Sequence, residues 1–383
     1  MTNRRKFLSL VGGGVILAAG GGALWATTRD PAAARRPWEV AAGSSETDPR
    51  RSALAYAVLA PNPHNRQPWI ADLSVADEIT LFCDPERRLP ETDPFDRQIT
   101  IGLGCFLELL SIAAAEQGYR TGISLFPDGE PQPRLDGRPV ARIRFARDAD
   151  VERDPLFAHI LERRSNKEPY DVTRPVEGAL LQAIADAARS GNVAFAAGQP
   201  EVRSLRERTW EAMLTEITTP RTMQESVDLM RIGRAEIEAS PDGIDLSGAF
   251  IEGLALTGLL NRADLVDSQS SAFQQQLPIL KAPFDTAMAF LWLTTRGNGR
   301  KAQIDAGRDH VRMNLQATAL GVSMHPFSQA LQEFPEMAPH HDAMREFLRV
   351  PDEETLQMLV RLGYGPAVKA GPRWPYESRI RGA

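Results

Sequence analysis

The stretch Ala60-Pro-Asn-Pro-His-Asn-Arg-Gln-Pro-Trp69 gathers side chains that could hold a polar, planar ligand. Its prolines lie on both sides of His64 and Asn65. Because proline fixes its own φ and keeps the preceding residue out of the α region, we expect a rigid and extended backbone here. Imidazole and amide groups on such a loop can donate and accept hydrogen bonds at fixed positions. The alternative interpretation is a helix-to-strand corner in which Trp69 fills the core.

A second polar cluster is Ile160-Leu-Glu-Arg-Arg-Ser-Asn-Lys-Glu-Pro169, at the end of a helix predicted to start at Asp154 and Pro155. Between residues 163 and 167 it offers two guanidinium groups, a hydroxyl and an ammonium. These groups suit the oxygens of a phosphate. The segment therefore indicates a phosphate site, with a solvated basic helix end as the alternative.

A third stretch follows a long predicted helix and reads Ala317-Thr-Ala-Leu-Gly-Val-Ser-Met-His-Pro-Phe-Ser-Gln329. Its His325 is either a group that faces a ligand or a satisfied loop residue. Elsewhere, the adjacent His340 and His341 have no partner four residues away and no carboxylate at a ligand spacing. We therefore expect no metal site.

Hydrophobic periodicity predicts the elements that position these stretches. Apolar residues recur at helical spacing from Arg97 to Tyr119 and from Ala302 to Gly321, and Gly118 and Gly321 end the two runs. Because the two helices look equivalent, the sequence indicates two related halves, 48–150 and 151–383. Strands are predicted at 70–75, 79–83, 123–126, 141–145, 288–295 and from 358 onward.

Residues 221–285 are predicted to be a helical insertion in the second half. An insertion of this length often covers a site, so a lid is one hypothesis. The other is a helical hairpin that packs on the core or on a partner subunit.

Composition narrows the class of protein. The chain has 383 residues, 43% of them apolar, and a formal net charge of -6. Its basic residues are scattered, which argues against a nucleic-acid partner. Its two cysteines, Cys83 and Cys105, exclude a disulfide scaffold and a multi-cysteine metal site.

Residues 1–28 predict a targeting segment. Arg4-Arg-Lys-Phe-Leu8 begins it, and the run from Phe7 to Thr28 is uncharged and contains six glycines. The paired arginines resemble the twin-arginine export signal, which implies a contact with export machinery and a periplasmic or other extracytoplasmic location. The alternative is an uncleaved membrane anchor, since about 20 apolar residues cross a bilayer. Residues 29–47 are predicted to be a tether outside the fold.

In this order, the three polar stretches resemble signatures of the nitroreductase-like flavoproteins. The loop resembles Ser/Asn-x-x-Asn-x-Gln-Pro-Trp, the basic segment resembles Arg-x-Ser-x-Lys/Arg, and the third stretch resembles Ala-Leu-Gly-Leu-x-x-x-Pro. The resemblance implies FMN as the cofactor and a nitroreductase-like α+β fold, with antiparallel-rich sheets packed on long central helices. The residues that it assigns to the FMN site are Asn62, His64, Asn65, Gln67, Arg163, Arg164, Ser165, Lys167, Met324, His325, Pro326, Ser328, Gln329 and Arg373.

The family pattern also implies roles at the phosphate end. Arg163, Ser165 and Lys167 would grip the FMN phosphate, with Arg164 beside the ribityl chain. Arg373 would add a basic group from the tail, with Lys369 as the second choice; the alternative for either is a plain surface residue.

At the ring end, the pattern implies that Met324, His325 and Pro326 lie against the flavin. Ser328 or Gln329 would donate a hydrogen bond to N5, where the family often has Glu-Gly. Donors near N5 stabilise the negative charge that appears on reduction.

The signatures are split between the halves: the first has the loop, and the second has the basic segment but no Gln-Pro-Trp in Ala188-Arg-Ser-Gly-Asn-Val-Ala-Phe195. This resembles the Acg-type subfamily and implies a fused pseudo-dimer with one flavin site between its halves, as a monomer or a homodimer. The implied function is an exported FMN-dependent oxidoreductase that passes hydride from N5 to a small aromatic or electrophilic acceptor. No residue is then a catalytic nucleophile, and His64 and His325 are candidates for the substrate side. The alternative is an FMN-binding or sequestering protein whose lid prevents turnover.

Overall fold

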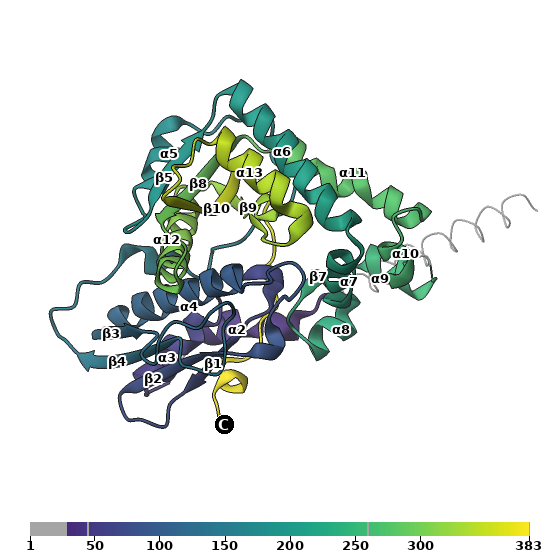
Figure 1. The fold of residues 1–383 in the computed structure, drawn as a ribbon. Coiled ribbons are helices and arrows are strands. Elements are labelled where there is room, and N and C mark those ends of the chain that lie inside the picture. The colour runs from purple at the N-terminus through teal and green to yellow at the C-terminus, as the bar shows by residue number, and fades with distance from the viewer. Residues whose placement is uncertain (1–28, 44–45, 259, 383) are drawn as a thin grey trace, which may run out of the picture.

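The computed structural model describes residues 29–43, 46–258 and 260–382. The predicted export signal, at residues 1–28, lies outside the described residues. Within the described part, the strands form two four-stranded antiparallel sheets and one short parallel pair (Figure 1). The α+β class, with antiparallel sheets and long helices, is therefore confirmed.

The first half is built on one sheet with the strand order β1-β2-β4-β3. The predicted hairpin at its start is confirmed, because β1 and β2 pair antiparallel from Trp69 opposite Cys83. Its elements in chain order are α3 (Pro49–Ala57), η1 (Pro63–Asn65), β1 (Trp69–Asp72), β2 (Glu78–Cys83), η2 (Pro85–Arg87), α4 (Arg97–Glu116), β3 (Tyr119–Leu125) and β4 (Ala141–Arg147).

The second half is built on the other sheet, with the order β5-β8-β10-β9. Its elements, apart from an insertion between β5 and β8, are η3 (Pro155–His159), α5 (Gly178–Ala185), β5 (Asn192–Ala196), β8 (Ala289–Arg296), α12 (Arg300–Ala319), β9 (Ser323–Pro326), η4 (Gln329–Leu331), η5 (Pro335–Met337), α13 (Ala338–Phe347), β10 (Glu354–Gly363) and η6 (Tyr376–Arg379).

The two sheets share one connectivity. In each, two strands are followed by a 20-residue helix and then by two more strands, and the fourth strand lies between the second and the third. The left-handed glycines after the helices, Gly118 at φ 80° and Gly321 at φ 68°, also correspond. The predicted relation between the halves is thus confirmed by topology.

The central helices α4 and α12 cross at two glycines and lie between the sheets (Figure 1). A Cβ on Gly104 would come closer than 3.0 Å to the carbonyl oxygen of Ile304, and a Cβ on Gly307 would come equally close to that of Ile101. The two contacts are reciprocal, with the same spacing along each helix, so the halves are related by a local two-fold axis at this crossing. The sequence of α4 is apolar enough for a membrane span, but this helix is core, with 83% of its most apolar window buried.

The first residue of each central helix reaches into the opposite half. The guanidinium of Arg97 donates to the carbonyl oxygens of Leu331 at 2.6 Å and Gln357 at 2.9 Å. That of Arg300 donates to the carbonyl oxygens of Pro131 at 3.1 Å and Pro133 at 2.8 Å. Both arginines are almost fully buried, so these bonds hold the halves together where water does not compete.

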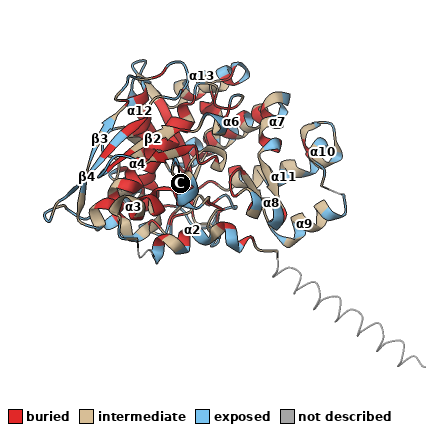
Figure 2. Cartoon of the chain, turned by 90° about the horizontal axis from the view of Figure 1, so that it is seen from below, coloured by how far each residue is buried: buried red, intermediate tan, exposed pale blue. Residues whose placement is uncertain are grey.

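The insertion between β5 and β8 starts earlier than predicted, at Gln199, and is mainly helical. Its elements are α6 (Gln199–Thr218), α7 (Pro220–Asp228), β6 (Met230–Ile232), α8 (Gly233–Ala239), β7 (Ile244–Leu246), α9 (Ala249–Leu256), α10 (Arg262–Val266) and α11 (Ser271–Asp285). It has a small core of its own around Met223 and Phe273. Figure 2 shows that buried residues concentrate on the central helices and sheets, whereas α8 to α11 are mostly accessible.

Residues 29–47 are not the tether that we expected. Over the described part of this range the chain forms α2 (Ala32–Ala42), with Ala34, Pro37, Trp38 and Ala41 buried. The indole Nε1 of Trp38 donates to the carbonyl oxygen of Gly371 at 2.9 Å. The alanine- and arginine-rich sequence looked like a linker because the partner of its one aromatic residue lies at the far end of the chain.

The helix predicted from Asp154 is also wrong beyond one turn. The carboxylate of Asp154 accepts from the Leu156 backbone N–H, as an N-cap should, but regular structure ends at His159. The chain then turns away because Asn166 donates its backbone N–H to the carbonyl oxygen of Met324 at 3.1 Å. Side chains of the basic segment are therefore displayed from an irregular loop.

We expect Gly307→Ala to lower the free energy of unfolding by about 3 kcal/mol, because the added methyl would push apart two backbones that have no flexible side chain between them. Alanine is normally about 1 kcal/mol more favourable than glycine in a helix, so helix propensity alone would stabilise the variant. A loss of stability would therefore indicate steric crowding at the crossing. Urea unfolding followed by circular dichroism measures it. Gly122→Ala on β3, where a Cβ meets nothing within 4 Å, is the control. Equal stability of the two variants would contradict the close crossing.

Candidate functional site

The loop between α3 and β1 is tightly turned rather than extended. His64, Asn65 and Gln67 have φ of 46°, 51° and 51°, a left-handed conformation that non-glycine residues rarely adopt. The side-chain oxygen of Asn62 accepts from the Gln67 backbone N–H at 2.7 Å and closes the turn. Strained backbone of this kind is held in place by its surroundings and clusters at functional sites.

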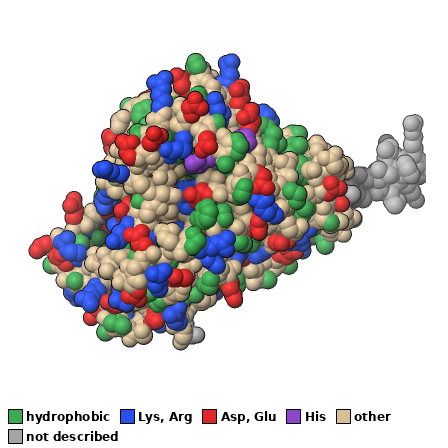
Figure 3. Space-filling model, in the orientation of Figure 1, with side chains coloured by type: hydrophobic (Ala, Val, Ile, Leu, Met, Phe, Trp, Pro, Cys, Tyr) green, Lys and Arg blue, Asp and Glu red, His purple; other side chains and the backbone are tan. Residues whose placement is uncertain are grey.

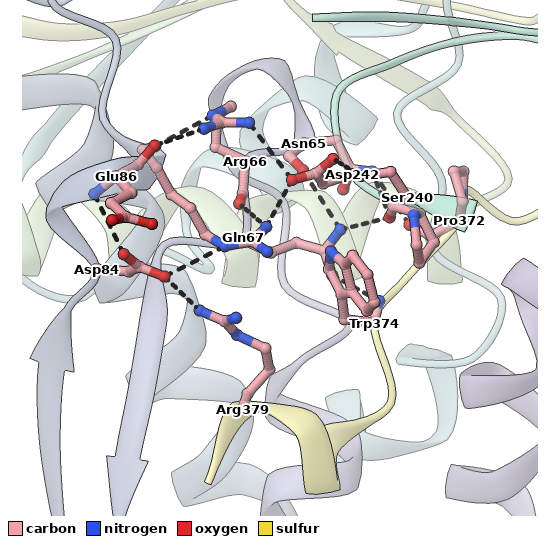
Figure 4. Close-up of polar contacts among 12 residues, drawn as sticks. Asn65, Arg66, Gln67, Asp84, Glu86, Ser240, Asp242, Pro372, Trp374 and Arg379 are labelled. Carbon is pink, nitrogen blue, oxygen red and sulfur yellow. Dashed lines mark hydrogen bonds and ion pairs between the residues drawn. The ribbon is translucent and has the colours of Figure 1, made fainter. Parts of the chain in front are cut away.

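Gln67 joins this loop to two distant parts of the chain. It is fully buried; its Nε2 donates to the carbonyl oxygen of Pro241 at 2.7 Å, and its Oε1 accepts from the Trp374 backbone N–H at 2.9 Å (Figure 4). We predicted a cofactor contact for Gln67, but both polar atoms of its amide have partners inside the protein. Gln67 therefore fixes the loop, and its contact with a cofactor stays a prediction.

The amides of Asn62 and Asn65 are engaged in the same way. Asn62 Nδ2 donates to the carbonyl oxygen of Ala60 at 3.1 Å. Asn65 Oδ1 accepts from Arg373 at 2.7 Å, and its Nδ2 donates to the carbonyl oxygen of Pro372 at 3.1 Å. The structure thus gives both residues a part in shaping the loop.

Asp242 in the insertion fixes the same loop electrostatically. Its buried carboxylate pairs with Arg87 at 2.6 Å, Arg231 at 3.0 Å and Arg66 at 3.4 Å, and it accepts from the Ser240 hydroxyl at 3.1 Å (Figure 4). The turn at 240–243 therefore joins the insertion to the loop through buried ion pairs, which are costly to break from one side.

Arg163, Arg164 and Arg373 surround the indole of Trp38. Their guanidinium carbons lie 5.9, 4.8 and 5.7 Å from its ring centroid. Arg163 donates to the Asn314 side chain at 3.1 Å and to the carbonyl oxygen of Leu59 at 2.9 Å. Arg373 donates to the same carbonyl oxygen at 3.3 Å. The basic segment, the tail and the start of the loop are therefore brought together, and we call these three arginines with Trp38 the arginine cluster.

The arginine cluster carries more positive charge than its protein surroundings offset. Burial, and then repulsion from its neighbours, lowers the pKa of Arg163 to about 10 and that of Arg373 to about 9. Burial also lowers the pKa of Arg164. The Nε atoms of all three are buried without a hydrogen-bond partner, and none forms an ion pair with a carboxylate in the described part of the chain. Buried cations in this state are stabilised by a bound anion.

Lys167 links this region to two histidines from opposite halves. Burial, and then the charges of Lys167 and Arg66, lowers the pKa of His64 to about 4. Burial, Arg361 and Lys167 hold the pKa of His325 well below its ordinary value. Hydrogen bonds join the same parts, since Arg163 donates to Leu59 at the start of the loop and Asn166 donates to Met324 of β9, so the loop, the basic segment and β9 lie together.

Lys167 is exposed as a residue, yet the surrounding protein desolvates its amine and lowers the pKa of that amine, with Asp245 opposing the shift. Neither Lys167 nor the Ser165 side chain makes a hydrogen bond or an ion pair with another described residue. The second choice for the tail, Lys369, is instead paired with Asp30 at 2.9 Å. Of the two tail candidates, Arg373 is the one in the arginine cluster.

The residues predicted to lie beside the flavin ring occupy two places, strand β9 and the start of η4. Met324 is buried in β9, and His325 and Pro326 are half-buried on the same strand. Ser328 precedes η4 and does not cap it with its side chain. The Gln329 Oε1 is buried without a partner, and its side chain lies close to Glu216 of α6. Gln329 is thus directed towards the insertion.

Sequence reasoning missed Trp38 and Arg361. Arg361 is fully buried in β10, inside the apolar run Met358-Leu-Val-Arg-Leu362. A single charge in a buried strand was the signal that could have identified it, because such a charge needs several partners. Trp38 gave a weaker signal, as one aromatic residue in a helix of alanines and arginines.

No model of a known protein family matches the chain. Its sequence is similar to a protein of Mycobacterium tuberculosis H37Rv provisionally named NAD(P)H nitroreductase, with 28% identity over 331 residues that cover 86% of this chain and 88% of the relative. It is also similar to the acg protein of the same strain, which has the same provisional name, with 26% identity over 344 residues, covering 85% of this chain and 92% of the relative.

Solved structures show a weak overall similarity. An FMN-bound nitroreductase from Desulfitobacterium hafniense aligns with a TM-score of 0.35 and 14% identity, covering 61% of this chain and all of that one. The FMN-dependent nitroreductase NfnB from Mycobacterium smegmatis, in complex with NADPH, aligns with a TM-score of 0.36 and 18% identity, covering 58% of this chain and 95% of that one.

The buried Glu216 predicts a pH dependence of stability. Burial raises its pKa from 4.5 to about 7, although Gln332 donates to it at 3.0 Å. The folded state therefore holds this proton more tightly than the unfolded chain, and the stabilisation present below pH 4.5 is lost as the pH rises towards 7. We expect the free energy of unfolding of Glu216→Gln, relative to that of the wild type, to rise by about 3 kcal/mol between pH 4.5 and pH 8. Unfolding by urea at both pH values measures this, with the exposed Glu211→Gln of the same helix as the control. A difference between variant and wild type that does not change with pH would refute it.

Proposed function

We propose that this chain, a distant homologue of the nitroreductase-like proteins, is an FMN-dependent oxidoreductase that transfers hydride to a small aromatic or electrophilic acceptor. The observation that carries the proposal is the arginine cluster, whose buried cations have no anionic partner among the described residues. A phosphate monoester supplies two negative charges and several acceptor oxygens at such a place.

The residues present fit an FMN phosphate. Arg163, Arg164 and Arg373 have free Nε–H groups, and Lys167 adds an ammonium without a protein partner in the described chain. Ser165 lies between them in sequence as a hydroxyl donor. Arg163 and Arg373 each donate to the carbonyl oxygen of Leu59 and so also hold the loop against the phosphate end of the site.

FMN, when bound, supplies hydride transfer at N5. What the chain supplies is position and charge. His64 from the first half and His325 from the second are both neutral at pH 7, because their pKa values are lowered to about 4 and well below 6.5. They can therefore hydrogen-bond to a ligand without adding charge, while Lys167, whose charge acts on both, favours an electron-rich group.

We further propose that the chain is exported, with its cofactor, by a twin-arginine pathway and works outside the cytoplasm. This part of the proposal is supported by Arg4-Arg-Lys-Phe-Leu8 and the uncharged run that follows it. Retention of that run as a membrane tether is the alternative. Because two related halves pair within one chain, a monomer has the contacts that a dimer of simple halves would make; a homodimer is the other arrangement.

If these residues bind the phosphate, their substitution should weaken the binding of FMN but not of riboflavin, which has the same ring without the phosphate. We expect Lys167→Gln and Arg164→Gln to raise the dissociation constant for FMN about 10- to 100-fold, the loss of one charge-assisted contact, and to leave riboflavin binding unchanged. Fluorescence titration of flavin-free protein measures both ligands. Arg142→Gln, in an exposed pair with Asp128, is the control.

Two results would overturn the assignment. One is a wild-type protein that binds no FMN. The other is a variant that loses riboflavin and FMN affinity equally, since the residue would then support the fold rather than the phosphate.

A second candidate function, storage of FMN without turnover, is favoured by the ion pairs of Asp242 and the hydrogen bonds of Gln67. They fix the insertion and the tail onto the loop, and such an attached cover would slow exchange of any ligand beneath it. Reduction of the loaded protein by NADPH and reoxidation by a quinone, followed by stopped flow, separates the two functions. Turnover supports the enzyme, and indifference to both reagents supports storage.

We expect Asp242→Asn to release FMN at least tenfold faster than the wild type, because three arginines lose their carboxylate and the insertion detaches from the loop more often. Transfer of FMN to an excess of an apo-flavodoxin, followed by fluorescence, gives the rate. Asp128→Asn at the surface is the matched control. Equal release rates in the variant and the wild type would show that the insertion does not limit exchange.

A further inference from the structure

We propose that Arg361 is a positioning residue that fixes His325 as the tautomer with its proton on Nε2, and that this N–H is a hydrogen-bond donor to the ligand of the site. The ligand part rests on the proposed function; the tautomer part does not.

The tautomer follows from the chemistry of the pair. Arg361 on β10 lies opposite His325 on β9 in the antiparallel register, and its Nε donates to the imidazole Nδ1 at 3.2 Å. A guanidinium has N–H donors and no acceptor. Nδ1 must therefore offer its lone pair, so the single proton of the neutral ring is on Nε2.

Arg361 cannot easily turn away from this bond. Its Nη1 donates to the carbonyl oxygen of Pro283 at 2.8 Å, and its Nη2 donates to that of Glu168 at 2.8 Å. Its guanidinium carbon lies 3.8 Å from the ring centroid of Tyr170. The same side chain thus holds the end of the insertion, the basic segment and His325 in one arrangement.

The other side of the imidazole is open. His325 is half-buried, and its Nε2 makes no hydrogen bond with the described residues and is not among their buried unsatisfied atoms. The ring packs edge-on against Phe327, with centroids 5.2 Å apart. Lys167 lies close enough to lower the pKa of His325 together with burial and Arg361. Nε2 is therefore a neutral donor beside an ammonium, at the place where the two halves converge.

A donor held in this way binds without releasing its proton. A neutral imidazole gives up its remaining proton far less readily than an imidazolium does, and the protonated form is disfavoured here. His325 can therefore hold an oxygen or nitrogen lone pair of the ligand over the whole physiological pH range. The Nδ1 tautomer would present a lone pair at the same point and repel that ligand atom.

Nuclear magnetic resonance of the full chain, labelled with ¹⁵N-histidine, tests the tautomer directly. We expect the His325 ring, identified by the signals missing in His325→Phe, to show an unprotonated Nδ1 and a protonated Nε2 that persist from pH 8 to pH 5.5 without flavin. A protonated Nδ1, or a ring that titrates near 6.5, would overturn the proposal whatever the function of the protein.

Two substitutions test the part played by Arg361. In Arg361→Met, which keeps a long side chain but removes every N–H donor, we expect a mixture of the two tautomers. Arg174→Met, which removes an arginine stacked 3.8 Å from the Tyr364 ring, is the control and should leave the His325 signals unchanged. A pure Nε2–H tautomer in Arg361→Met would show that Arg361 is not the positioning group.

Loading the same labelled protein with FMN tests the ligand part. We expect the Nε2–H signal of His325 to shift on loading, or on addition of a quinone to the loaded protein, since a new acceptor meets that proton. An Nε2–H signal that stays unchanged in both steps would refute the role as a ligand donor. If FMN does not bind at all, the proposed function fails while the tautomer result stands.

Discussion

The close crossing of α4 and α12 is the constraint on which the rest of the structure depends. Two glycines let backbone touch backbone at a local two-fold axis, and each helix is thereby set at a fixed depth between the sheets. The arginine at the start of each helix then reaches carbonyl groups of the opposite half. The halves behave as one packed body, so residues contributed by each can meet with the precision that a shared site needs.

The same pairing explains how a site is built from chain segments far apart in sequence. Asn314 of the central helix α12 holds Arg163, and Arg163 holds the carbonyl oxygen at the start of the loop. The insertion and the tail approach from the other side and meet the loop through Asp242 and Gln67 (Figure 4). At the surface, basic and acidic groups are interspersed over the face in Figure 3. In the interior, however, the arginine cluster has an excess of positive charge, whereas the arginines around Asp242 are paired with its carboxylate.

The sequence predicted what depends on local periodicity and residue chemistry. The long helices, their glycine ends, the first hairpin and the residue types of the arginine cluster could all be read in this way. It did not predict partners that come from hundreds of residues away. The hydrogen bonds of Gln67 to Pro241 and Trp374 are an example, because local sequence patterns carry no information on either partner. The range that contains Trp38 was predicted to be a tether for the same reason. The left-handed turn at His64 could not be inferred, because the prolines around it favour an extended backbone.

The docking of α2 has a consequence for the order of events during biosynthesis. The backbone N–H of Arg373 donates to the carbonyl oxygen of Ala34, and Trp38 donates to that of Gly371. Helix α2 and the segment 371–373 therefore hold Trp38 and Arg373 together in the arginine cluster. Gly371 follows Trp38 by 333 residues, so a nascent polypeptide holds α2 long before it holds the partner of Trp38. The contacts that place Arg373 beside Trp38 can therefore form only after both four-stranded sheets and both central helices have been synthesised.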